Sequence, residues 1–119
     1  MVSACFFPDN VEEVYGTYLA EYTFGTEKLT LKSDGTYIQE VRISGNPGPL
    51  ISTGKWNYDP TAHRGEAWNL YVVADGFGKL VQDYDVRKEG LSSFPVGRYF
   101  WSRRLRLGPD EGSPYNKLY

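Results

Sequence analysis

The sequence predicts an all-β fold, an antiparallel up-and-down β-barrel of about eight strands with a short N-terminal helical turn. Apolar and polar residues alternate along most segments, which is typical of strands with one buried and one wet face. Thirteen Gly and seven Pro supply frequent turns, and aromatic residues make up 16% of the chain. A two-sheet β-sandwich is the alternative, but a barrel buries an aromatic face without leaving strand edges.

A chain of 119 residues corresponds to one domain. We expect a leader segment at residues 1–9, the barrel at 10–107 and a C-terminal tail at 108–119. The single Cys5 excludes an intrachain disulfide. Residues 2–5 are similar to the end of a bacterial lipoprotein signal. Only four residues precede Cys5, so the charged and apolar parts of such a signal are absent. We therefore expect a cytoplasmic protein by default, and a lipoprotein or periplasmic one if the chain is truncated before Cys5.

The first segments combine a helical start with alternating strands. Asn10 followed by Glu13 predicts a helical turn at residues 10–14, because these residue types cap a helix N-terminus. A strand follows at residues 16–24, with Tyr18, Ala20, Tyr22 and Phe24 on one face. The next strand, at residues 28–32, turns Leu29 and Leu31 inward.

The middle segments begin with a hairpin. Asp34-Gly35 between two alternating runs is a strong turn signal, because Gly adopts positive φ without steric cost. Residues 36–43 form the following strand, with Tyr37, Gln39, Val41 and Ile43 on one face. Residues 45–49 form a loop, and the strand at 51–58 places Trp56 and Tyr58 together.

The later segments continue the same alternation. We expect strands at residues 66–74, 79–87 and 96–107, separated by a turn at 75–78 and a loop at 88–95. The inward residues would be Trp68, Leu70 and Val72 on the first strand, Leu80, Tyr84 and Val86 on the second, and Tyr99, Trp101, Arg103, Leu105 and Leu107 on the third.

Three short motifs resemble the lipocalin-like (calycin) barrels, especially small uncharacterised bacterial ones. They are Gly16-Thr17-Tyr18 after the helical turn, the hairpin from Leu29 to Tyr37, and Thr53-Gly54-Lys55-Trp56. Tyr18 stands where the family has Trp. The resemblance implies an eight-stranded barrel in which Arg103, near the end of the last strand, packs across Tyr18. A cation–π contact of about 1–2 kcal/mol would stabilise that buried charge.

The barrel interior is the candidate site. Eight strands enclose enough space for packed side chains or for one small ligand, and aromatic walls with a few polar groups suit a small apolar or aromatic ligand. The same residues fit plain core packing. The candidate lining residues are Tyr18, Tyr22, Tyr37, Gln39, Trp56, Trp68, Tyr84, Trp101 and Arg103.

Other chemistry has weaker support in the residues. The net charge of −2 argues against nucleic-acid binding, and no apolar run is long enough to span a bilayer. His63 has no second ligand at metal spacing, so we expect no metal site, and no motif points to a cofactor or a catalytic residue. Asp83 and Asp85 are interpreted as a solvated face.

Two further functions remain open beside ligand binding. The first is a protein-interaction or structural module with a filled core, which would use the outward Arg98, Arg104 and Arg106 and the tail; a homodimer is compatible with this pattern. The second is a barrel enzyme, an isomerase or hydrolase, which requires a carboxylate or His inside the barrel with a partner in reach. The sequence favours a non-enzymatic role.

Overall fold

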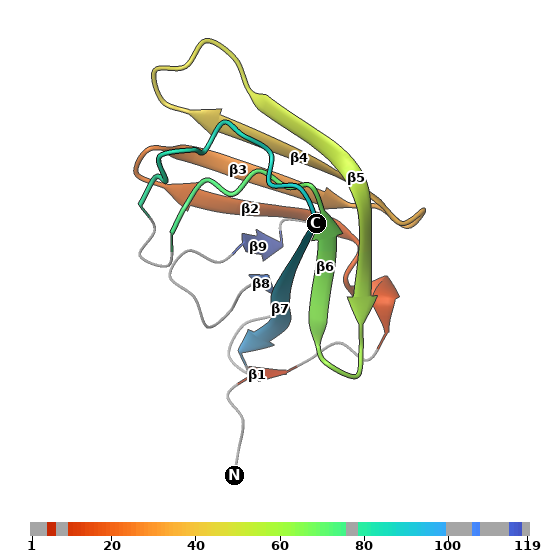
Figure 1. The fold of residues 1–119 in the computed structure, drawn as a ribbon. Helices are drawn as coiled ribbons and strands as arrows, with labels where there is room; N and C mark the ends of the chain where they lie inside the picture. Colours follow the sequence, from red (N-terminus) through yellow and green to blue (C-terminus); the bar gives the residue numbers. More distant parts are fainter. Residues whose placement is uncertain (1–4, 7–9, 76–78, 100–105, 108–114, 118–119) are drawn as a thin grey trace.

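The computed structural model describes residues 5–6, 10–75, 79–99, 106–107 and 115–117 of the chain. Within these ranges the fold is all-β, with one 3-10 turn as its helical structure (Figure 1). The elements are β1 (Cys5–Phe6), η1 (Val11–Glu13), β2 (Gly16–Tyr22), β3 (Gly25–Leu31), β4 (Thr36–Ile43), β5 (Leu50–Asp59), β6 (Arg64–Trp68), β7 (Leu91–Tyr99), β8 (Arg106–Leu107) and β9 (Tyr115–Lys117).

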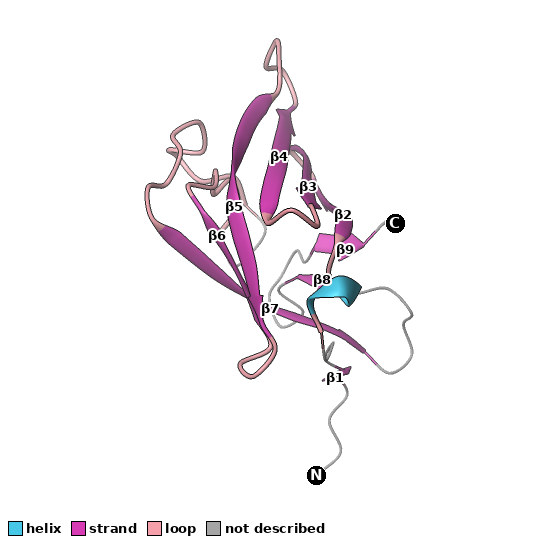
Figure 2. Cartoon of the chain, turned by 90° about the vertical axis from the view of Figure 1, so that its right-hand side faces the viewer, coloured by secondary structure: helices cyan, strands magenta, loops and turns pink. Residues whose placement is uncertain are grey.

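Strands β2 to β7 form one antiparallel sheet in which each strand pairs with its neighbour along the chain. Strand β5 pairs with β4 through residues 50–55 and with β6 through residues 56–59. The sheet therefore curls at β5 into a half-barrel, whose curvature is visible in Figure 2. The short strands β8 and β9 pair with each other and also with β7 and β2, respectively, while β1 pairs with β7.

The elements predicted for the first half are confirmed, with shifted boundaries: β3 begins at Gly25, three residues before the expected start, and β5 is one residue longer at each end than expected. The helical turn is η1, although the Asn10 side chain makes no capping hydrogen bond. Gly35 takes a φ of +84° in the turn between β3 and β4, and Asp34 accepts hydrogen bonds from both the backbone and the hydroxyl of Thr36. Strand β2 ends at Tyr22, so the expected extension to Phe24 is wrong. Residues 23 and 24 instead form a tight turn before Gly25.

The strand expected at residues 66–74 is confirmed only as far as Trp68, and the strand expected at residues 79–87 is wrong. Strand β6 stops at Trp68, because Asn69 adopts a left-handed φ of 63° that a strand cannot continue. After Trp68, the described part of this region has two isolated β-bridges in place of a ladder: Tyr71 with Arg87 and Ala74 with Leu80. Trp68, Val72, Leu80 and Val86 were all predicted to face inward but are exposed, whereas Leu70 is buried as predicted. In β6 the inward residues are Gly65 and Ala67, so Trp68 lies on the outer face before the chain reaches Asn69. The left-handed conformation of Asn69 then breaks the alternation, and Leu70 and Val72 no longer share a face.

The last expected strand is also wrong in its boundaries. Strand β7 begins at Leu91, inside the segment expected to be a loop, and Val96 pairs with Leu107 in β8. Residues 96–107 therefore cannot be one strand, because their two ends lie opposite each other. Residues 100–105 themselves lie outside the described ranges.

The concave face of the sheet carries two clusters of buried apolar side chains. The first cluster lies against η1, β6 and β7 and consists of Val14, Tyr18, Leu29, Leu31, Tyr37, Trp56, Tyr58, Ala67, Leu70 and Val96. The second cluster consists of Val41, Ile43 and Val73, with the partly buried Tyr22, Phe24, Leu50, Tyr71 and Tyr84 packed against it. The inward faces predicted for β3, β4 and β5 are confirmed by this burial.

Candidate functional site

A segment without strand structure lies against the concave face of the sheet. We call residues 69–75 and 79–90 the covering segment (Figure 1, green to teal, and Figure 2). Its two halves are joined by backbone hydrogen bonds: Asn69 N–H donates to the Gly90 carbonyl, Lys88 N–H to Leu70 and Val81 N–H to Val73, each at 2.9 Å. This segment covers the second cluster and determines what can reach it.

The sheet holds the covering segment through polar side chains. The Gln39 amide nitrogen donates to the Tyr71 carbonyl and the Tyr71 N–H donates to the Gln39 amide oxygen, both at 2.8 Å. Gln39 thus gives Tyr71 the two hydrogen bonds that a neighbouring strand would otherwise supply. Ser52 donates to the Asn69 carbonyl at 2.9 Å, and the Tyr37 hydroxyl donates to the Trp68 carbonyl.

Glu27 is the buried carboxyl group among the described residues, and the sequence interpretation missed it. Its side chain, 2% exposed, accepts hydrogen bonds from the Tyr22 hydroxyl at 3.0 Å and from the Gln39 amide nitrogen at 2.7 Å. No described cation pairs with it. Burial raises the pKa of Glu27 to about 7 from an ordinary value of 4.5, although both hydrogen bonds act to lower it.

The strand alternation already contained the signal for Glu27. Residues 27, 29 and 31 of one strand must share a face, because successive side chains point to opposite sides of a sheet. Leu29 and Leu31 were predicted to face inward, and extending the same alternation by two residues places Glu27 beside them.

The predicted lining residues separate into two groups. Tyr18, Tyr37 and Trp56 lie in the first cluster, and each donates to a backbone carbonyl: Tyr18 to Val14 at 2.7 Å, Trp56 to Lys32 at 2.8 Å, and Tyr37 to Trp68. Burial raises the pKa of the Tyr18 phenol. These polar groups are satisfied within the protein, as buried tyrosines and tryptophans require.

Tyr22 and Gln39 form the second group, which meets at Glu27. The partly buried Tyr84 packs against the second cluster, and its hydroxyl oxygen accepts a hydrogen bond from Asn46 at 3.0 Å. The Trp68 side chain is 38% exposed and belongs to neither cluster, although its backbone carbonyl accepts the Tyr37 hydrogen bond. Trp101 and Arg103, with the expected stacking of Arg103 on Tyr18, lie outside the described residues.

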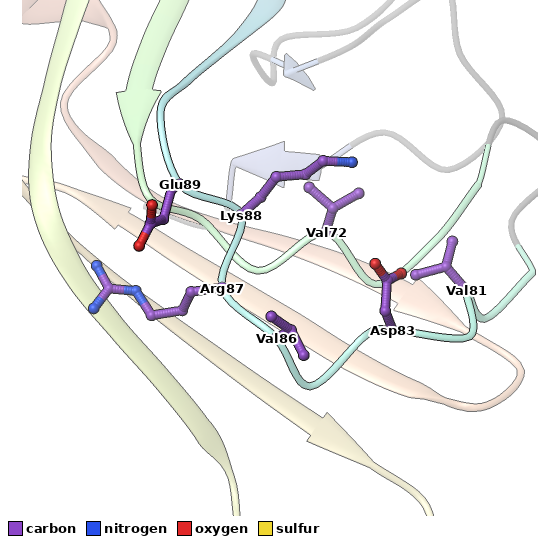
Figure 3. A pocket seen from close by; sticks show the side chains of 7 residues that line it. All are labelled: Val72, Val81, Asp83, Val86, Arg87, Lys88 and Glu89. Carbon is purple, nitrogen blue, oxygen red and sulfur yellow. The ribbon is translucent and has the colours of Figure 1, made fainter.

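The covering segment also forms a hollow of about 300 Å³. Figure 3 shows Val72, Val81 and Asp83 gathered on one side of the segment, with the Lys88 side chain reaching past Val72. Val86, Arg87 and Glu89 complete the lining. Arg87 is committed to the protein, donating to the carbonyls of Asn69 and Thr53. Within the described ranges, neither Lys88 nor Asp83 has an ion-pair partner.

The hollow and the second cluster lie on opposite faces of the covering segment. Val73 is 1% exposed and packs with Val41 and Ile43 of the sheet, whereas the adjacent Val72 is 37% exposed and lines the hollow. A ligand in the hollow would therefore not contact Glu27, because the covering segment lies between them.

The remaining candidates for chemistry have little structural support. His63 lies in the turn between β5 and β6 with a left-handed φ of 55°. Among the described residues, no group of three or more His, Cys, Asp or Glu side chains is placed to hold a metal ion. No helix in the described ranges is long and apolar enough to cross a membrane. The side chains of Arg98, Arg104 and Arg106 lie outside those that the structure describes.

Comparison of the chain with protein-family models, with curated proteins and with solved structures finds no match in any of the three. Glu27, the covering segment and its hollow are therefore the features from which a function can be inferred.

Proposed function

We propose that this chain is a small-molecule-binding domain whose ligand, small and mostly apolar, occupies the hollow of the covering segment. The observation that carries the proposal is the hollow itself, about 300 Å³ in volume and lined by three valines and by the charged Asp83, Arg87, Lys88 and Glu89. This volume is at the lower end of small-ligand pockets, which combine apolar walls with a few polar groups. The lipocalin-like motifs of the sequence support the same class of function.

The position of the ligand differs from the one the sequence suggested. Tyr37 and Gln39, two candidate lining residues, use their polar groups in hydrogen bonds to the backbone of Trp68 and Tyr71. Side chains in this position hold the covering segment and leave ligand contacts to the residues of that segment. We therefore propose Val72, Val81 and Val86 as the apolar walls and Lys88 with Asp83 as the polar contacts.

The proposal is tested with three probes that share one apolar tail: hexanoate, hexylamine and hexanol. We expect saturable NMR shifts at the amides of Val72, Val81 and Lys88 with at least one probe. The order of affinity then reports whether Lys88 or Asp83 dominates. Val72→Trp should fill the hollow and abolish the shifts. Val11→Trp is the matched control, because Val11 is equally exposed (36%) but lies in η1. Absence of saturable shifts with all three probes, or shifts that persist in Val72→Trp, would overturn the proposal.

We further propose that the half-barrel closes into the eight-stranded barrel that the sequence predicts. The support is the chain of short pairings from β7 to β8, from β8 to β9 and from β9 to β2. Nuclear Overhauser contacts across the pairs Val96–Leu107 and Tyr18–Lys117 would test it. If the contacts across either pair are absent, the sheet is open and the proposed barrel is wrong.

A barrel enzyme is the second candidate, and Glu27 favours it. A carboxyl with a pKa near 7 can give or take a proton near neutral pH, and such shifted groups gather at catalytic sites. If a bound compound is identified, the wild-type protein should convert it chemically and Glu27→Gln should bind it unchanged. Recovery of the unchanged compound from both proteins would leave binding as the function.

A further inference from the structure

We propose that ionisation of Glu27 releases the covering segment from the sheet, so that access to the concave face depends on pH. This regulation concerns the same segment that forms the hollow, and so it rests on the proposed function for its purpose. It does not depend on that function for its test.

Burial among apolar neighbours favours the neutral form of Glu27, and the two hydrogen bonds that it accepts oppose this effect only in part. Ala20 of β2 and Val41 of β4 are its direct neighbours across the sheet, and Tyr22 and Gln39 donate to its two oxygens. The nearby charged residues Lys28 and Arg42 are exposed, on the opposite face of the sheet by strand alternation. The titratable groups packed around the second cluster are the phenols of Tyr22, Tyr71 and Tyr84. Burial and the neighbouring Glu27 raise the pKa of Tyr22, so its hydroxyl stays protonated.

The covering segment is tied directly to this carboxyl. The Gln39 amide nitrogen donates both to Glu27 and to the Tyr71 carbonyl, and its amide oxygen accepts from Tyr71 N–H. Gln39 is thus the one side chain that contacts both Glu27 and the backbone of the segment among the hydrogen bonds of the described residues. Water that reaches an ionised Glu27 from the concave side must therefore displace the segment near Tyr71.

The covering segment should open at a lower free energy than the sheet. Regular ladders hold Glu27 between β2 and β4, whereas the covering segment has isolated bridges and a few backbone hydrogen bonds, and most of its residues from Lys79 to Gly90 are exposed. Regions with these features open at lower free energy than the core strands. A buried carboxylate without a cation is costly, and opening the segment lets water relieve that cost while the sheet remains intact.

Hydrogen exchange at single amides tests this directly. The reporters are Tyr71, which donates to Gln39, and Val81 and Lys88, which join the halves of the segment. After correction for intrinsic exchange, their opening equilibrium should rise about tenfold for each pH unit between about 5 and 7 and then level off. They should also exchange faster than the ladder amides of β3 and β4 and show little sensitivity to low urea, because the opening is local.

Two variants and one control complete the test. Glu27→Gln keeps the size of the side chain but cannot ionise, so exchange at Tyr71 should lose its pH dependence. Tyr22→Phe removes a hydrogen bond that lowers the pKa of Glu27, so the plateau should move to higher pH. Glu21→Gln changes an exposed carboxyl of β2 and should leave the wild-type profile unchanged.

Three results would overturn the inference, and two of them need only the wild-type protein. They are a pH-independent opening at Tyr71, an opening of the segment only together with the core strands, and an identical pH profile in Glu27→Gln. If the pH-dependent opening is observed but none of the six-carbon probes binds, the proposed function fails and this inference stands.

Discussion

The two buried clusters lie on the same face of the same sheet but are closed in different ways. The first cluster packs mainly against regular elements, with Val14 after η1, Ala67 from β6 and Val96 from β7, and it takes one side chain, Leu70, from the covering segment. The second cluster is closed by the covering segment, whose backbone is not part of a ladder. The difference lies in what faces the sheet, since both clusters use the same strand alternation.

This difference explains where the buried polar residues occur. A covering segment without a ladder brings unpaired N–H and C=O groups against the sheet, and buried backbone groups require partners. Gln39 and Ser52, which are 0% and 1% exposed, supply such partners to Tyr71 and Asn69. Buried polar side chains on the face of a sheet therefore indicate where an irregular segment packs against that face. Such residues can hydrogen-bond the backbone of the covering segment and need not contact a ligand.

The largest expected contrast is the loss of buried volume in the two clusters. Leu29→Ala removes a fully buried side chain from the first cluster and should lower the free energy of unfolding by about 2–5 kcal/mol. Val73→Ala should cost less, about 1–2 kcal/mol, because it removes two methyl groups from a segment that can readjust. Urea denaturation of both variants measures the difference. Equal losses would mean that the covering segment is packed as rigidly as the ladders.

The sequence predicted the ladder region better than the covered region, for a physical reason. Inward Leu29, Tyr37 and Trp56 follow from alternation, because a paired strand keeps its period of two. The same rule predicted strands at residues 66–74 and 79–87, where it failed. Asn69 takes a left-handed conformation, and its backbone and side chain both bond to Gly90.

The candidate site could be predicted only in part. Tyr22 and Gln39 were chosen as inward polar groups, and the structure brings both to Glu27. Glu27 itself was available from the alternation of β3. The turn predicted at residues 75–78 already places the two halves of the covering segment side by side, in agreement with the Ala74–Leu80 bridge and the Val81–Val73 bond. The hollow itself was not predictable, because Val72 is exposed and lines it where strand alternation had placed that residue inward.

The next contrast is the response of global stability to pH, which the second cluster should dominate. The pKa of Glu27 is about 7 when folded and 4.5 ordinarily, so between these values the folded protein holds a proton that the unfolded chain has released. Stability is therefore highest below about pH 4.5 with respect to this group. It falls as the pH rises toward 7, by on the order of 3 kcal/mol in total, and is flat above.

Urea denaturation between pH 5 and pH 8 measures this slope. Glu27→Gln should remove it, while Leu29→Ala should lower the whole curve and keep its shape, because the first cluster holds no carboxyl among the described residues. A wild-type stability that stays constant or rises with pH across this window would show that Glu27 is ionised without penalty in the folded protein.

The smallest expected effects come from removing one hydroxyl group at each cluster. Tyr18→Phe leaves the Val14 carbonyl without its donor at 2.7 Å and should cost about 1 kcal/mol at every pH. Tyr22→Phe removes a hydrogen bond that helps to hold the charge of Glu27, so its cost should be larger at pH 8 than at pH 5. Urea denaturation at the two pH values separates these responses. If the cost of Tyr22→Phe is the same at both, its hydroxyl does not stabilise the carboxylate, and the second cluster responds to the loss of a hydroxyl as the first cluster does.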